Sequence, residues 1–110
     1  MDNLELLRTA SAGMDAQRAA LDVLARNVAA SQAAGPKNSY ERLVPQFKVV
    51  DDGDSSEVEF AGTIAQRDDG GGVLSEMVAV LNASRAYEAN ASVFEIGKHL
   101  AERTIEMGKL

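Results

Sequence analysis

Two long stretches without proline, each with a seven-residue apolar repeat, constrain this fold more than any other feature. In residues 2 to about 34 the repeat consists of Leu7, Met14, Leu21 and Val28. In residues 73 to about 108 it consists of Val73, Val80, Tyr87, Phe94 and Ala101. A strict seven-residue repeat is typical of helices that wind around one another. We therefore predict two long helices, the second about 50 Å long at 1.5 Å per residue.

Local signals place the ends of the first helix. Asp2, with Glu5 three residues later, can form a capping box at its start. Gly35-Pro36 predicts its end, because glycine suits a left-handed cap and proline cannot continue the helix. Gly13 lies inside the helix, where it costs about 1 kcal/mol relative to alanine, and it indicates either a close approach or a loose position.

The middle of the chain has a different pattern. Phe47 and Val49 alternate with polar residues, and we place Val58, Phe60 and Ile64 together on one face of a second strand. The acidic run DDGDSSE between them predicts the turn of a β-hairpin, and Pro45 restricts the first strand to an edge. QRDDGGG, residues 66–72, is predicted to be a flexible link.

The predicted fold is mainly α: two long terminal helices pair as an antiparallel, coiled-coil-like hairpin, with a small β-hairpin inserted between them. The chain of 110 residues is long enough for one domain, 1–110. We divide it into an N-terminal helix (1–35), a hairpin and linker insert (36–72) and a C-terminal helix (73–110). Two such helices carry more apolar surface than a short insert can cover, which indicates a contact surface.

Composition narrows the function. The chain has no cysteine, which excludes disulfides and thiolate metal sites, and no apolar run of the 18 to 20 residues or so that a membrane span needs. The start, MDNLELLRTA, does not resemble a cleavable signal peptide. The net charge is −6, and eight acidic against four basic residues lie in 37–72. Nucleic-acid binding needs a basic stripe, so we do not expect it.

Candidate catalytic and metal-binding groups are few. His99 is the single histidine, and one histidine makes neither a metal cluster nor a catalytic set. DDGDSSE has its glycine second, whereas a calcium loop of the EF-hand type has it sixth. GGG at 70–72 lacks the lysine of a phosphate loop. We therefore predict no enzyme activity, no cofactor and no metal.

The two ends also resemble a known family. EMVAVLNASRAYEANASVF (76–94), followed by GKHLAERTIEMGKL, resembles the C-terminal signature of bacterial flagellar basal-body rod proteins, above all proximal rod proteins of FlgC type. SAGMDAQRAALDVLARNVAAS, followed by a Tyr-Glu-Arg stretch, is similar to the family's N-terminal region. The chain departs from the family where Ala30 replaces a second asparagine, and where QRDDGGGVLSEM replaces a longer segment before the last helix.

The resemblance implies a structural subunit of the proximal rod, exported by the flagellar type III apparatus without signal cleavage and located in the periplasmic basal body. Such subunits assemble through their terminal helices into a helical tube that transmits torque. The expected partners are other rod subunits, copies of this chain and the export apparatus. The residues that we expect at subunit interfaces are Leu7, Met14, Leu21, Leu24, Asn27, Val28, Met77, Val80, Leu81, Arg85, Tyr87, Asn90, Ala91, Phe94 and Leu100.

Four of these residues have alternative interpretations. Asn27 and Asn90 either bond between subunits and fix their register or are solvated on an outer helix face. Tyr87 either anchors an interface or makes a half-buried contact within the chain. Arg85 pairs with Glu88 of its own helix or with an acidic residue of a neighbour, and we favour the first.

Two other function classes stay open. One is a small helical-hairpin module, such as an adaptor, that binds a partner helix in a discrete complex. The other is an all-helical enzyme whose active site lies between the long helices. An enzyme of that kind needs titratable groups that converge on facing stripes, and the charged residues here are predicted to lie on outer faces.

Overall fold

The computed structural model describes residues 3–35, 38–51, 53, 56–68 and 72–108. Along the chain they form α1 (Asn3–Ala34), β1 (Tyr40–Asp51), β2 (Ser56–Asp68) and α2 (Gly72–Gly108). The predicted fold class is confirmed: two long helices contact each other, and an antiparallel two-stranded hairpin connects them. The predicted cap at Asp2 lies outside the described residues.

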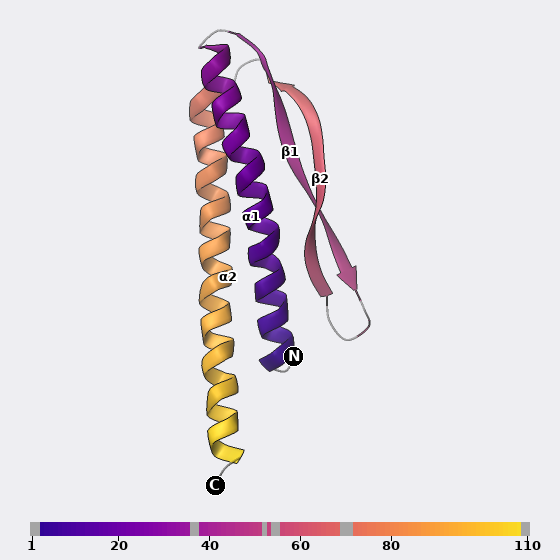
Figure 1. Cartoon of the computed structure of the whole chain (residues 1–110), viewed down its shortest axis with the longest axis vertical. Coiled ribbons are helices and arrows are strands. Elements are labelled where there is room, and N and C mark those ends of the chain that lie inside the picture. Colours follow the sequence, from indigo (N-terminus) through magenta and orange to yellow (C-terminus); the bar gives the residue numbers. More distant parts are fainter. Residues whose placement is uncertain (1–2, 36–37, 52, 54–55, 69–71, 109–110) are drawn as a thin grey trace.

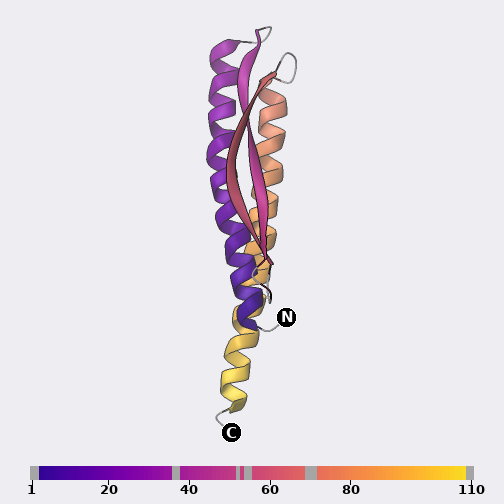
Figure 2. The same cartoon turned by 90° about the vertical axis from the view of Figure 1, so that its right-hand side faces the viewer.

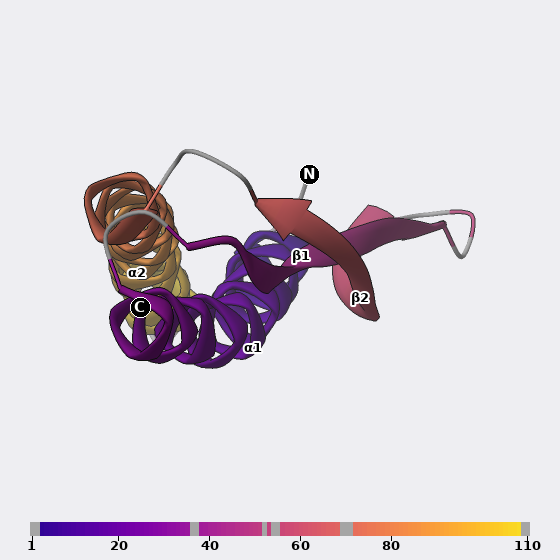
Figure 3. The same cartoon turned by 90° about the horizontal axis from the view of Figure 1, so that it is seen from above.

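The four elements form a long, thin molecule, with extents of 67 × 25 × 14 Å. The helices run antiparallel, and α1 contacts all three other elements, with the hairpin beside it (Figure 1, Figure 3). The last turns of α2 extend beyond the start of α1 (Figure 2). The second helix is therefore covered along only part of its surface.

The end of α1 follows the sequence signal. Gly35 has a φ of 86°, and its N–H donates a hydrogen bond of 3.3 Å to the carbonyl of Ser31. This left-handed residue closes the last turn at low steric cost, because glycine has no Cβ. The helix ends at Ala34, as the sequence predicts.

The hairpin is longer than the sequence suggests. Its strands have 12 and 13 residues, and residues 66–68, which we expected in a flexible link, belong to β2. The acidic run is not all turn either, since Asp51 and Ser56 are paired strand residues. The link prediction was wrong at its start because Gln66 and Arg67 find partners across the sheet in Arg42 and Glu41.

A β-bulge changes which residues of β2 share a face. Pro45 pairs with Thr63 and Phe47 with Phe60, so Ala61 and Gly62 together lie opposite Gln46. Gly62 has a φ of 96°, a conformation that favours glycine at a bulge. Because the extra residue reverses the alternation, Ile64 lies on the opposite face from Phe60. The expectation that these two residues share a face was wrong.

Small side chains make up most of the buried core. The buried apolar residues are Ala10, Ala16, Ala20, Val23, Leu24 and Ala83. The seven-residue repeats of both helices are only half-buried. In α1 the fully buried positions differ from the repeat because this helix is covered on two sides, by α2 and by the hairpin. The largest fully buried side chains are polar, Glu76 and Asn27.

Candidate assembly surface

The two helices approach closely where glycine removes a side chain. A Cβ added at Gly13 would lie 2.8 Å from the side-chain atoms of Asn90, and one added at Gly97 would lie 3.2 Å from Leu6 and Leu7. The first distance is too short for any real contact, so Gly13 marks a close approach, one of the two expected possibilities. Asn90 thus packs over Gly13 within the chain.

Replacing Gly13 with a branched residue should force the helices apart. We expect Gly13→Val to lower the free energy of unfolding by about 1–3 kcal/mol, as overpacking typically does. Urea denaturation followed by circular dichroism would measure the loss. In an Asn90→Ala background much of it should be recovered, and Ala29→Val, at an exposed position of α1, should change little. A full loss in the Asn90→Ala background would contradict the proposed clash.

Asn27 fixes the hairpin to α1. Its side chain is 1% exposed, and its amide nitrogen donates a 2.7 Å hydrogen bond to the carbonyl of Leu43. The N–H of Leu43 in turn donates a 2.7 Å bond to the amide oxygen of Asn27. One side chain therefore satisfies both backbone groups on the outer edge of β1, as a neighbouring strand would. The solvated alternative for Asn27 was wrong.

A buried carboxylate joins the hairpin to α2. Glu76 is 0% exposed, and its Oε1 accepts a 2.8 Å bond from the Tyr40 hydroxyl and a 2.9 Å bond from Nε of Arg42. Tyr40 and Arg42 are two positions apart on β1, so they point to the same face. The expectation that charged residues lie on outer faces was wrong for Glu76, because the hairpin brings a cation and a hydroxyl to it.

Tyr87 makes a contact within the chain. Nη2 of Arg18 donates a 3.1 Å hydrogen bond to its hydroxyl, and the guanidinium lies 5.8 Å from the ring centroid. The hydrogen bond to Tyr87 is the main cause that raises the pKa of Arg18 above its ordinary value. This contact matches the half-buried alternative for Tyr87, whereas its role between subunits stays a prediction.

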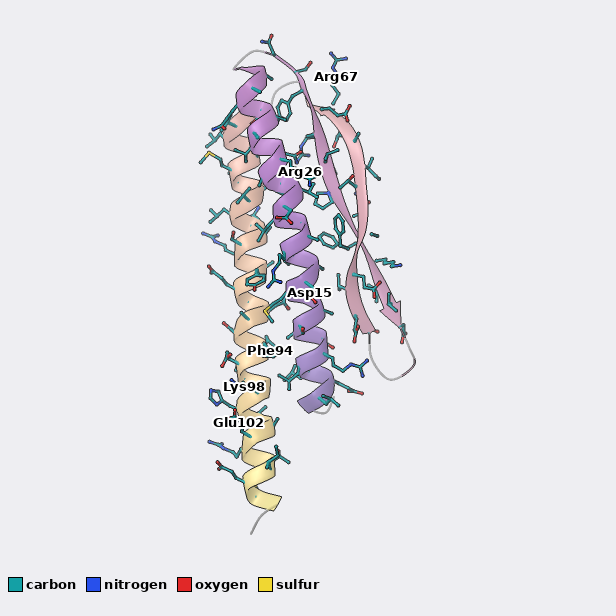
Figure 4. All side chains as sticks on the ribbon, in the orientation of Figure 1. Asp15, Arg26, Arg67, Phe94, Lys98 and Glu102 are labelled. Carbon is teal, nitrogen blue, oxygen red and sulfur yellow. The ribbon has the colours of Figure 1, made fainter. Side chains whose placement is uncertain are left out.

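The fifteen predicted interface residues fall into three groups. Leu24 and Asn27 are buried within the chain, and Met77, Leu81, Arg85 and Leu100 are exposed. The other residues are half-buried: Leu7, Met14, Leu21, Val28, Val80, Tyr87, Asn90, Ala91 and Phe94. Figure 4 shows Phe94 among the side chains of the helix pair. The side chains of Arg85 and Glu88, both described, form no ion pair, so the favoured pairing within the helix is wrong.

Much of α2 presents apolar side chains to solvent. Leu74 is 76% exposed, Ile96 58% and Met107 67%. Leu74 also lines a groove of about 680 Å³ between the helices, and none of the groove's lining residues is charged. Its lining consists of Ala25, Val28, Leu74, Met77, Val78, Val80, Leu81 and Ser84. Exposed apolar surface of this extent is typical of a contact site.

Comparison with known proteins identifies the family. No protein-family model matches the sequence. The chain is similar to the flagellar basal-body rod protein FlgC of Aquifex aeolicus (strain VF5), with 32% identity over 133 aligned positions that cover 99% of each chain. The chain belongs to the FlgC family of flagellar basal-body rod proteins.

The FlgC alignment is longer than this chain, so the relative has residues without a counterpart here.

The contact of buried Glu76 with Tyr40 and Arg42 also joins two segments on which the resemblance to FlgC-type proteins rests. Glu76 is the first residue of the segment EMVAVLNASRAYEANASVF (76–94), and Tyr40 and Arg42 come from the Tyr-Glu-Arg stretch. Sequence reasoning missed their contact, although the i, i+2 spacing of Tyr40 and Arg42 was a usable signal.

FlgC is a structural rod protein, so family membership indicates that this chain is not an enzyme. Within the described ranges, no three histidine, cysteine, aspartate or glutamate side chains gather as metal ligands would. His99 is exposed and lies 3.8 Å from Glu102 of the next turn. None of the helices, over the residues described, is both long and apolar enough to span a membrane.

Proposed function

We propose that the chain is a structural subunit of the flagellar basal-body rod, which assembles with other rod subunits and copies of itself through its terminal helices. Membership of the FlgC family supports the rod role. The observation that carries assembly through the helices is the exposure of large apolar residues along α2, from Leu74 to Met107. Assembly would remove this surface from water, at about 25 cal/mol per Å² of apolar area buried.

The residues open to a neighbour are a subset of those predicted. Met77, Leu81, Arg85 and Leu100 are exposed, so they can contact another subunit without rearrangement. Asn27 and Leu24 are buried by contacts within the chain, so we no longer assign them to a subunit interface. The half-buried residues along the helix pair contribute by holding α1 and α2 in the geometry that presents the exposed surface.

The remaining parts of the proposal come from the family resemblance. The subunit would lie in the proximal part of the rod, where helical packing of many copies forms a tube that transmits torque. Contacts that join different surfaces of successive copies do not close, and they build an open-ended helical assembly. The chain would reach the periplasmic basal body through the flagellar type III export apparatus, without cleavage of a signal peptide.

The proposal is tested by assembly and motility together. Met77→Asp, Leu81→Asp and Leu100→Asp, combined in one chain, should abolish rod assembly and swimming in a strain that lacks its own FlgC. The circular dichroism spectrum should be kept, since these side chains are exposed. Gln32→Asp with Ala33→Asp, on the exposed surface of α1, serves as the control and should swim.

Three outcomes decide the proposal. Open-ended oligomers on mixing the wild-type chain with other rod subunits support it. A discrete one-to-one complex would instead favour an adaptor module, and normal swimming of the triple variant would refute assembly through this surface. Secretion of the full-length chain by a strain with an intact export apparatus, and its retention when the apparatus is disabled, tests the route.

A further inference from the structure

Six exposed apolar residues lie along α2, outside the side that it buries against the rest of the chain. The residues that α2 buries, Glu76, Ala83 and Gly97, mark its inner side. Six of the nine large apolar residues that α2 exposes are called here the α2 stripe: Leu74, Val78, Leu81, Val93, Ile96 and Leu100. Their exposed fractions run from 38% for Val93 to 76% for Leu74. Leu74, Val78 and Leu81 also line the groove that α2 shares with Ala25 and Val28 of α1, and their exposed surface is open to a partner.

The α2 stripe is symmetric about Tyr87. Leu74, Val78 and Leu81 lie 13, 9 and 6 positions before it, and Val93, Ile96 and Leu100 lie 6, 9 and 13 positions after it. When two identical helices pack antiparallel, a residue before the centre in one meets the residue equally far after it in the other. Leu74 then faces Leu100, Val78 faces Ile96 and Leu81 faces Val93. Such self-complementarity is what a two-fold interface requires.

Charges near the centre fit the same arrangement. Arg85 lies two positions before Tyr87 and Glu88 one position after it, and both are exposed. In the antiparallel pair, Arg85 of each copy lies opposite Ala89 of the other and next to Glu88 of that copy, so two equivalent ion pairs can form. Ala89 is exposed, and its small side chain lets the helices approach closely there. The interface thus has complementary charges at its centre and apolar pairs on both sides.

We propose that the free chain forms an antiparallel two-fold dimer through the α2 stripe. The occupant of this surface before assembly is therefore a second copy of the same chain. A two-fold contact closes on itself, so the dimer cannot extend into a filament by the same surface. Dimerisation would compete with open-ended assembly. The dimer is a property of the free chain and stands or falls independently of the rod role.

Disulfide cross-linking tests the orientation directly, because the chain contains no cysteine and each variant therefore has a single thiol. Val78→Cys and Ile96→Cys are made in separate chains, mixed at high micromolar concentration and oxidised. The mixture should give a cross-linked heterodimer. Neither variant alone should cross-link, because in the antiparallel pair the two Val78 positions are about 27 Å apart along the axis at 1.5 Å per residue. Ala29→Cys, on the exposed surface of α1, mixed with Ile96→Cys controls for random collision.

Other patterns would overturn the proposal. Cross-linking of Val78→Cys with itself would indicate a parallel pair, and equal cross-linking of the Ala29→Cys control would indicate collision only. A chain that carries both Val78→Cys and Ile96→Cys should give a doubly linked dimer, whereas a ladder of higher oligomers would indicate open-ended contacts. Absence of any mixed product, in a chain that still supports swimming, would remove the dimer and leave the rod role intact.

The central charges give a second, independent readout. By analytical ultracentrifugation, Arg85→Glu should weaken dimerisation several-fold, because it places four acidic side chains together at the centre of the interface. The double variant Arg85→Glu/Glu88→Arg should restore it, since each copy again meets the opposite charge. Unchanged dimerisation in the Arg85→Glu chain, or a monomer at every concentration for the wild type, would contradict the proposal.

Discussion

Asn27→Ala should lower the free energy of unfolding by about 2–4 kcal/mol. The substitution leaves both the N–H and the carbonyl of Leu43 without their 2.7 Å partners at the edge of β1. Each buried backbone group left without a hydrogen bond costs about 1–3 kcal/mol. Because the two bonds join α1 to the hairpin, amide exchange should rise across β1 and β2 and change less in α2. Urea denaturation and hydrogen exchange measured by mass spectrometry would give the two quantities.

Ser31→Ala is the matched control for Asn27→Ala. Ser31 is also buried, at 3% exposure, and lies one turn further along α1. Its hydroxyl donates a 2.8 Å bond to the carbonyl of Val28 in the same helix, so its loss does not release the hairpin. We expect Ser31→Ala to lower the free energy of unfolding by less than about 1.5 kcal/mol, since it removes one such hydrogen bond. Equal losses in both variants, with no faster exchange in the strands, would show that Asn27 does not hold the hairpin.

Glu76→Gln should weaken the connection between the hairpin and α2. The neutral amide can still accept a bond from Tyr40 or Arg42, but it loses the charge-assisted part of the interaction with Arg42. A hydrogen bond to a charged group contributes about 1.5–3 kcal/mol, and the 25% exposure of the Arg42 side chain places the expected loss near the lower end, at about 1–2 kcal/mol. Oε2 of Glu76 is buried with no hydrogen-bond partner, and the substitution places an amide group there that has none either.

A double-mutant cycle separates this pair from the rest of the fold. Arg42→Lys keeps the charge but removes the fixed guanidinium geometry. It should therefore also lower the free energy of unfolding, by part of the amount that Glu76→Gln does. In the Glu76→Gln background, Arg42→Lys should then have a smaller effect than in the wild type. Glu95→Gln, at an exposed position of α2, should be close to neutral. Additive effects of the two substitutions at 76 and 42 would indicate that the side chains do not act together.

The helices could be predicted because their signals are local. The seven-residue repeats, the stop at Gly35 and the absence of proline act within a few turns of one another, and they predicted the fold class. They left Gly13 open as a close approach or a loose position, and the structure shows the close approach. The hairpin was harder to predict from the sequence. Its length depends on pairing across the sheet, and Gly62 changed the face of Ile64 through a bulge that no alternation pattern contains.

The polar contacts of the core could not be read from the sequence because their partners are distant along the chain. Asn27 bonds to a residue 16 positions away and Glu76 to residues 34 and 36 positions away. A helical pattern shows which face a residue occupies but not which strand will pass over it. Family resemblance pointed to the segments that contain these residues, whereas only the structure shows that Glu76 contacts Tyr40 and Arg42.

The shortest dimension of the molecule, 14 Å, is little more than the width of one helix with its side chains. A molecule this thin buries few side chains completely. Its free energy of unfolding therefore depends on the neighbouring molecules that contact its two broad faces. A substitution that lowers the free energy of unfolding of the purified chain should have a smaller effect inside the flagellum, because neighbouring subunits cover the same faces. Genetic screens that score swimming would then miss many substitutions whose destabilising effect is clear in unfolding experiments on the purified chain.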